Sequence, residues 1–233
     1  MTHYPGDATQ PAPVRVLAIN PNTNPTVTQR VREVLQAQAP PGVIIEAESP
    51  HQGPRAVESG QDKTRAASHV MALIESRMAQ GYAGYILACF DDIAVAEARA
   101  LTGAPVVSLA EAGIRRADAT GGPFTVITTF EGAVATIESL CESYDVKERC
   151  RVVATGIGVS ETAARTTLAE TRLASLCEGA RAEGARAIVL GSGAFAGRGA
   201  QLTRRHGLPV MDGFAEALAF VLRQAEPMRA RGT

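Results

Sequence analysis

Short runs of aliphatic residues alternate along the chain with longer stretches in which apolar residues recur at helical spacing. Runs of this kind, bounded by turn-forming residues, are typical of strands buried on both faces of a sheet. Strands separated by helices of this length pair in parallel through right-handed crossovers. The expected strands are residues 14–20, 43–47, 85–88 and 105–108, followed by 124–129, 151–155, 187–191 and 209–211. The pattern therefore predicts an α/β fold with mostly parallel sheets.

Helices are expected in the stretches between these strands. Asn24 suits the N-cap of the first helix, because its side-chain oxygen can accept a hydrogen bond from a free backbone amide of the first turn. Pro25 suits the first helical position, because proline has no backbone N–H that needs a partner. Further helices are expected at about 59–80, 92–101, 132–143 and 162–183, and from about residue 199. Residues 214–224 carry apolar side chains on both faces, so we expect this last stretch to pack back on the first half of the chain.

One pattern of strand and strand tip occurs twice. Tyr85-Ile-Leu-Ala-Cys89 matches Ala187-Ile-Val-Leu-Gly-Ser192, and each run ends in a small nucleophilic side chain. Downstream, residues 104–112 match residues 208–217. A repeat of nearly half the chain predicts two similar lobes whose strand tips face one another across a cleft. The expected division is a flexible tail at 1–13, a first lobe at 14–112, a second lobe at 113–212, and a C-terminal helix within 213–233 that returns to the first lobe.

Composition narrows the class of partner. The chain has 233 residues, 45% of them apolar, and a formal net charge of -1, so it carries no basic footprint for nucleic acid or an anionic membrane. We expect a small-molecule substrate instead. The first thirteen residues are polar and proline-rich, without the apolar core of a signal peptide, and no apolar run reaches membrane-spanning length. These features predict a cytoplasmic protein.

The cysteines are expected to be reduced thiols. Four are present, at positions 89, 141, 150 and 177, and none forms a C-x-x-C pair. The four histidines do not cluster, so no metal site is expected. Cys141, Cys150 and Cys177 are predicted to pack in the core.

Short polar side chains gather where the predicted strands end. Ligands of open parallel sheets bind at this edge, so we interpret Asn20, Cys89, Thr128, Thr129 and Ser192 as candidate site residues. A cysteine near a helix N-terminus has a lowered pKa, which would let Cys89 act as a base near neutral pH. No Ser-His-Asp pattern surrounds Ser192, which is therefore expected to donate a hydrogen bond.

Two simpler interpretations compete with this site. The segment from Asn20 to Thr23 has the composition of a turn and helix cap alone. Residues 191–197, with Asp212 downstream, imitate a glycine-rich dinucleotide motif. The matching loop of the first half lacks these glycines, and dinucleotides bind at the first strand-helix turn of their fold, so we expect no cofactor here.

Four segments together resemble one known family. Residues 15–23, 86–92, 105–112 and 188–193 are similar, in this order, to the hydantoin and allantoin racemases of the aspartate/glutamate racemase superfamily. The resemblance implies two lobes related by a pseudo-twofold axis, each with a mostly parallel four-stranded sheet flanked by helices. It also implies a homo-oligomeric, cofactor-independent isomerase in which one cysteine from each lobe flanks the acidic α-carbon of the substrate.

The chain departs from this family at two positions. Cys89 matches the cysteine of the first lobe, but Ser192 stands where the cysteine of the second lobe is expected. Asp91 stands where the family usually has glycine. Because general acid-base catalysis contributes about 10²- to 10⁴-fold, losing one thiol should badly impair a two-base racemisation.

Three functions remain open at this point. The first is a racemase or epimerase of a hydantoin, allantoin or related cyclic ureide, with Ser192 marking an inactivated Cys-to-Ser form. The second is a natural single-cysteine decarboxylase or isomerase, for which arylmalonate decarboxylase is the precedent, although its cysteine lies on the second lobe. The third is a small-ligand binding protein that retains the cleft. The predicted catalytic residues are Cys89 and Ser192, and the predicted substrate-binding residues are Asn20, Phe90, Asp91, Thr128, Thr129 and Gly193.

Overall fold

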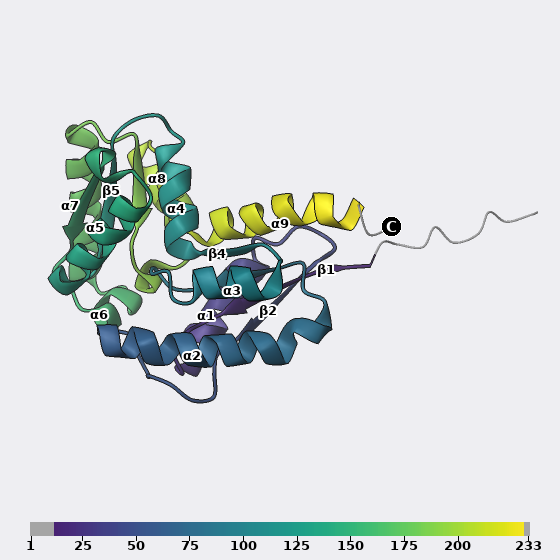
Figure 1. The fold of residues 1–233 in the computed structure, drawn as a ribbon. Coiled ribbons are helices and arrows are strands. Elements are labelled where there is room, and N and C mark those ends of the chain that lie inside the picture. The colour runs from purple at the N-terminus through teal and green to yellow at the C-terminus, as the bar shows by residue number, and fades with distance from the viewer. Residues whose placement is uncertain (1–11, 231–233) are drawn as a thin grey trace, which may run out of the picture.

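A computed structural model describes the backbone of residues 12–230 and side chains as far as Glu226 (Figure 1). It contains two four-stranded sheets, both parallel throughout, with matching strand orders β2-β1-β3-β4 and β6-β5-β7-β8. The first sheet comprises β1 (Val14–Ile19), β2 (Val43–Glu48), β3 (Gly84–Leu87) and β4 (Val106–Ser108). The second comprises β5 (Phe124–Thr128), β6 (Cys150–Ala154), β7 (Ala187–Leu190) and β8 (Val210–Met211). The predicted α/β fold with two similar lobes is confirmed.

Both faces of each sheet are covered by helices. The helices are α1 (Pro25–Gln36), α2 (Gly60–Arg77), α3 (Val95–Thr102), α4 (Leu109–Asp118), α5 (Val134–Ser143), α6 (Val159–Ala163), α7 (Thr167–Ala182), α8 (Gly199–His206) and α9 (Phe214–Ala230). Short 3₁₀ turns are η1 (Met78–Gln80), η2 (Glu131–Ala133), η3 (Lys147–Arg149) and η4 (Gly193–Phe195). Within residues 12–230, no helix is both long and apolar enough to cross a bilayer.

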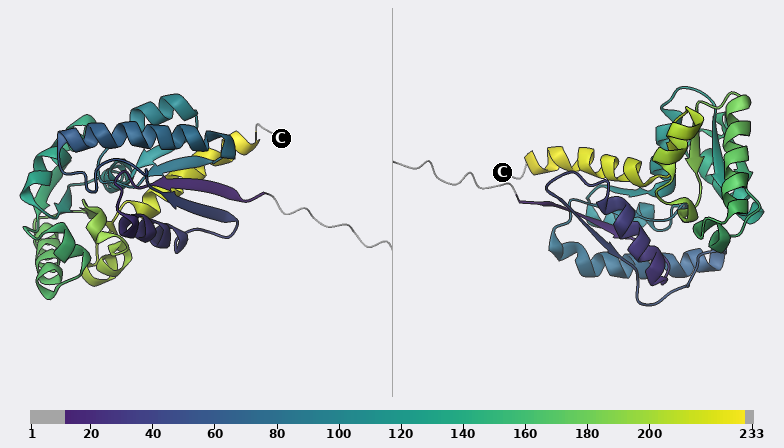
Figure 2. Two further views of the ribbon diagram at one scale, coloured as in Figure 1. Left: turned by 90° about the horizontal axis from the view of Figure 1, so that it is seen from below. Right: turned by 180° about the vertical axis from the view of Figure 1, so that it is seen from behind.

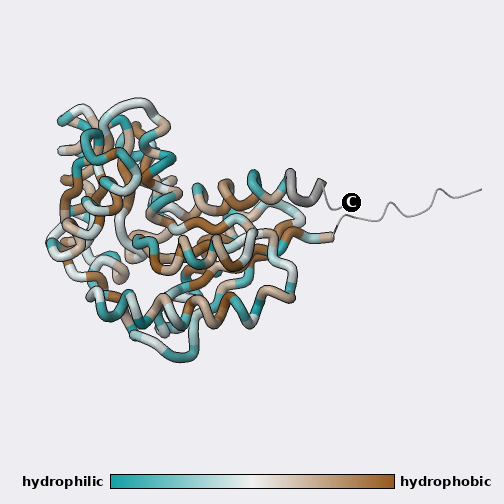
Figure 3. The backbone as a smooth tube through the Cα atoms, in the orientation of Figure 1, coloured by the Kyte–Doolittle hydropathy of each residue, from teal (hydrophilic) through white to brown (hydrophobic). Residues whose placement is uncertain are grey.

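Alternating strand residues build two cores in each lobe. Figure 3 shows hydrophobic residues concentrated inside each lobe, with more hydrophilic ones on its outer helices. In β1, Val16 and Ala18 face α1 and α9, whereas Leu17 and Ile19 face α2 and α3. In the second lobe, one face packs against α4 and α5 and the other against α7 and α8. This burial on both faces explains why the strands are continuous aliphatic runs.

Each lobe is completed by a helix from the other half of the chain. Helix α4 follows β4 of the first sheet, yet Ile114 and Ala117 join the core that contains β5 and β7. Helix α9 follows β8, yet Phe214 and Val221 join the core of the first sheet. The two further views in Figure 2 show α9 lying alongside the first lobe. The lobes are thus joined by an exchange of helices.

The structure differs from the predicted helices in two places. Helix α4 was not expected, although Ser108 accepts a hydrogen bond from the Glu111 amide at 2.9 Å and so caps it. The helix expected at 162–183 is broken into α6 and α7, because Arg165 has a φ of 56° and Thr166 caps α7. A left-handed residue cannot continue a right-handed helix.

Candidate active site

Cys89 lies directly after β3 and is half-buried against the core that α2 and α3 cover. Desolvation raises the pKa of its thiol to about 12, and the Asp91 carboxylate adds to this, while Lys63 acts in the opposite direction. The expected lowering of this pKa is wrong. Helix α3 begins only at Val95, so Cys89 does not lie in the first turn of that helix.

Asp91 is held by an ion pair. Its carboxylate lies 2.5 Å from Lys63 Nζ of α2, and its side chain is only 16% exposed. The same carboxylate accepts a hydrogen bond from the Asp92 amide at 2.9 Å. Asp91 therefore has partners within the protein, and its predicted contact with substrate stays a prediction.

Asp92 connects the two lobes. Its Oδ1 accepts a hydrogen bond from Ser108 at the end of β4, at 2.5 Å, and its Oδ2 accepts one from the Tyr144 hydroxyl after α5, at 2.6 Å. Desolvation and the nearby Asp92 carboxylate raise the pKa of Tyr144, so the phenol stays protonated and donates. The sequence analysis did not single out Asp92 or Tyr144.

Ser192 lies at the matching tip of the second sheet. Its Oγ accepts a hydrogen bond from the Ala194 amide at 3.3 Å and so begins η4. Among the described residues, Ser192 Oγ makes no other hydrogen bond, and no basic side chain is hydrogen-bonded to it. Gly193 is exposed. The nearly buried Arg198 donates to the Ala194 carbonyl at 3.4 Å and supports the same loop.

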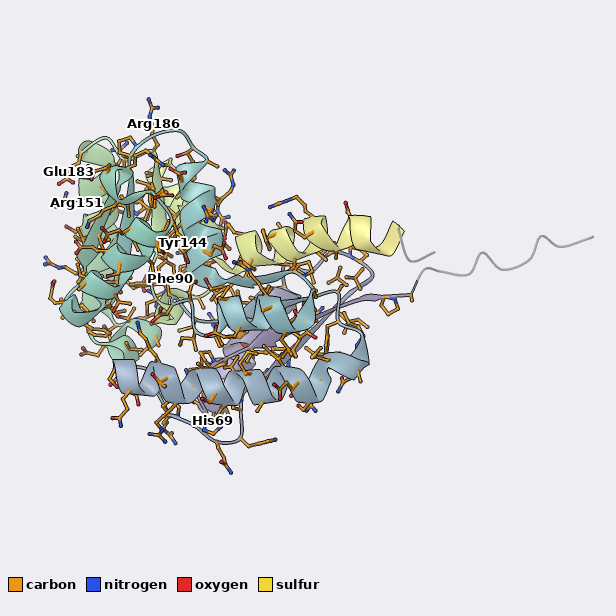
Figure 4. All side chains as sticks on the ribbon, viewed as in Figure 1. His69, Phe90, Tyr144, Arg151, Glu183 and Arg186 are labelled. Atoms are coloured by element: carbon orange, nitrogen blue, oxygen red, sulfur yellow. The ribbon has the colours of Figure 1, made fainter. Side chains whose placement is uncertain are left out.

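The two strand tips meet through Phe90. Its ring, from the loop after β3, packs against the core of the second lobe. A Cβ placed on Gly191, at the end of β7, would lie 3.4 Å from Phe90 Cε1 and 2.7 Å from Val126 Cγ1, so only glycine fits there. Figure 4 shows Phe90 and Tyr144 together where the lobes meet. The residue after Cys89 thus lies beside the residue before Ser192.

The remaining predicted residues with polar side chains are buried at the strand ends. Asn20 is fully buried, and its amide donates to Asn22 Oδ1 at 2.9 Å and to Thr28 Oγ1 at 3.1 Å. Thr128 donates to the Gly191 carbonyl at 3.0 Å and joins the tips of β5 and β7. Thr129 is buried beside it. Asn20 therefore orders its own turn, and a contact of these three residues with substrate remains a prediction.

The described residues offer no cluster of three or more histidine, cysteine or acidic side chains that would hold a metal ion. Asp212, the acidic residue of the dinucleotide-like motif, accepts backbone hydrogen bonds from Gly197 at 2.8 Å and Phe214 at 3.3 Å. Its carboxylate is thus occupied in joining the loop after β7 to the start of α9. Asp212 therefore has a structural role, whereas the dinucleotide motif would require its carboxylate to bind a ribose hydroxyl.

Comparisons with known proteins agree with this architecture. Residues 16–221 match the family described as Asp/Glu/Hydantoin racemase. A hydantoin racemase from Rhizobium meliloti is 32% identical over 202 residues, covering 86% of this chain and 84% of the relative. An allantoin racemase structure from Klebsiella pneumoniae superposes with a TM-score of 0.86 at 32% identity, over 94% of this chain and 89% of that one. The allantoin racemase from Pseudomonas fluorescens gives 0.84 at 30% identity, over 94% and 92%. The chain therefore belongs to the Asp/Glu/hydantoin racemase family, as its four characteristic segments predicted.

Proposed function

We propose that this protein moves a proton at the acidic α-carbon of a hydantoin, allantoin or related cyclic ureide without a cofactor. Cys89 would be the acid or base on one face of that carbon, and Ser192 would lie at the opposite face. The observation that supports this most strongly is the position of Phe90 beside Gly191 and against the second-lobe core, since it brings together the loops that carry Cys89 and Ser192. The racemases among its relatives support the class of substrate.

Cys89 suits the role of proton donor. Because its pKa is raised to about 12, the thiol is almost entirely protonated at pH 7. A neutral thiol can protonate an enolate that forms on its side of the substrate, whereas abstraction requires a thiolate that is rare in this environment. Backbone amides near Phe90 and Gly193 would stabilise the enolate oxygen.

Ser192 is poorly suited to proton abstraction. An alcohol needs an adjacent base before it can abstract a proton. Among the described residues, Ser192 Oγ is hydrogen-bonded only to the Ala194 amide, which is a donor. Its hydroxyl proton is therefore free to donate to a ligand. This asymmetry favours single-cysteine chemistry, a decarboxylation or isomerisation with Cys89 alone, as the second candidate function.

Proton NMR in D₂O tests these proposals with 5-substituted hydantoins and allantoin. Racemisation by the unchanged chain should be slow, and Ser192→Cys should raise its rate by about 10²- to 10⁴-fold. If Ser192→Cys still racemises none of these compounds while they bind, the racemase proposal is wrong. Turnover of another acid by the unchanged chain, lost in Cys89→Ala, would support the single-cysteine enzyme. A raised melting temperature without deuterium incorporation would instead indicate a binding protein.

A further inference from the structure

Two cysteines outside the candidate active site lie in contact. Cys141, on the last part of α5, places its Sγ 3.2 Å from Sγ of Cys150, the first residue of β6. Both are free thiols in this structure, as are Cys89 and Cys177. The sequence analysis expected core packing for each cysteine singly, and the pairing emerges only from the fold.

One residue of the pair is partly exposed. Cys141 is buried, but Cys150 is half-buried and lines a pocket of about 190 Å³. Phe124, Thr125 and Ala180 also line it. Because Phe124 and Cys150 begin their strands, this pocket lies at the edge of the second sheet opposite the tip that carries Ser192. A molecule as small as hydrogen peroxide fits such a space.

The charges at the mouth of this pocket are already paired. Arg149 lies 2.7 Å from Asp118, and Arg151 forms an ion pair with Glu183, whose side chain is labelled beside it in Figure 4. These two arginines flank Cys150 in the sequence and line the same pocket. The two arginines that line this pocket therefore have partners, which favours a small neutral oxidant over an anionic ligand at this position.

We propose that Cys141 and Cys150 are a modification site at which hydrogen peroxide, or an organic hydroperoxide, converts the two thiols into an intramolecular disulfide. One sulfur, as thiolate, attacks a peroxide oxygen; the O–O bond breaks, hydroxide leaves, and a sulfenic acid remains. The second sulfur attacks the sulfenic sulfur, so that the S–S bond forms and the S–O bond breaks. With protons returned to both hydroxides, two thiols and one hydrogen peroxide yield one disulfide and two waters.

The geometry makes this pair the favoured one. The sulfurs need to approach by only about 1.2 Å to reach the usual bond length of about 2.05 Å. The two thiols are hydrogen-bonded, and the contact with Cys150 lowers the pKa of Cys141, so the pair contains the more acidic thiol that exchange requires. Cys89 and Cys177 have no such sulfur neighbour among the described contacts.

The closed segment reaches the candidate active site. It spans nine positions and includes Tyr144, whose hydroxyl contacts Asp92. The bond would therefore fix both ends of the segment that carries the contact between the lobes. The proposal does not depend on the reaction proposed above, because its readout is covalent.

Peptide mapping of the unmodified full-length chain tests the proposal. After brief treatment of the folded protein with hydrogen peroxide, non-reducing digestion should yield a peptide linking residues 141 and 150, and dithiothreitol should remove it. The oxidised protein should melt a few degrees higher, since the bond restricts the unfolded chain. A linked peptide that forms only after unfolding, or bonds distributed equally among all cysteines, would overturn the proposal.

Cysteine variants provide a second measurement. Cys150→Ser and Cys141→Ser should each lose the linked peptide and accumulate a sulfenic acid that dimedone traps, whereas Cys177→Ser should retain the link. Cys177 is the matched control, because it is a buried thiol of the same lobe. A dimedone adduct equal in all three variants would contradict the assignment. Should any variant fail to fold, the map of the unmodified chain still decides.

Discussion

Asp91 should control how readily Cys89 ionises. Asp91 is the largest influence after desolvation that raises the Cys89 pKa to about 12, and Lys63 acts against it. Asp91→Asn removes the negative charge, leaves an oxygen for the Asp92 amide, and frees Lys63 from its 2.5 Å ion pair. Because desolvation remains, we expect the pKa to fall by about 1 and to stay above 9. Lys63→Met should shift it in the opposite direction.

Alkylation kinetics measure this shift. Iodoacetamide reacts with the thiolate, so at about pH 9 a pKa lower by about 1 makes Cys89 react about tenfold faster. Labelling is followed at the peptide that contains Cys89, which separates it from the three other cysteines. Glu75→Gln is the control, because it removes an exposed charge from the same helix as Lys63. Equal labelling rates in Asp91→Asn and the unchanged chain would refute the electrostatic reasoning.

Three substitutions test the contacts that join the lobes, and a fourth, Gly207→Ala, is a control for the effect of a positive φ alone. Tyr144→Phe should destabilise the protein by about 1–3 kcal/mol in urea unfolding, because a partly buried carboxylate oxygen loses its donor. Gly191→Ala should cost about 1–3 kcal/mol, since the added Cβ meets a valine methyl at 2.7 Å and the Phe90 ring at 3.4 Å; an unchanged melting temperature would contradict this packing. Gly213→Ala should cost about 3 kcal/mol or more, because φ is 83° and the Cβ would lie 2.5 Å from a backbone oxygen. Gly207→Ala, with φ of 70° and open space, should cost only about 1 kcal/mol.

The strands could be predicted because their burial leaves a local signature. Continuous aliphatic runs such as residues 85–88 fit a strand covered on both faces, and β3 lies there, one residue earlier. Helix α4 was missed because it begins at the residue after β4, without an intervening turn. The available signal was the spacing of Ser108 and Glu111, which is typical of a capping box.

The local sequence pattern could not predict which sheet each helix packs against. The helical stretch at 109–118 shows an apolar face, but nothing in it says that this face meets β5 and β7 of the other half. The same limit applied to the site. The repeated strand tips made Cys89 and Ser192 candidates, yet they gave no sign of Tyr144, which lies 52 positions from Asp92 and contacts it. The Cys89 pKa depends on the surrounding apolar core, which a strand-tip position does not reveal.

The exchange of helices also determines how the site can open. Phe214, Leu218 and Val221 of α9 are almost completely buried in the first lobe, and burying each such side chain contributes about 2 kcal/mol. Detaching α9 so that the lobes swing apart would therefore cost about 6 kcal/mol. The contact of Gly213 with the backbone of Leu109 adds a steric constraint where the connections cross. Separation of the lobes is therefore costly, and we expect a ligand to reach the strand tips while α9 stays packed on the first lobe.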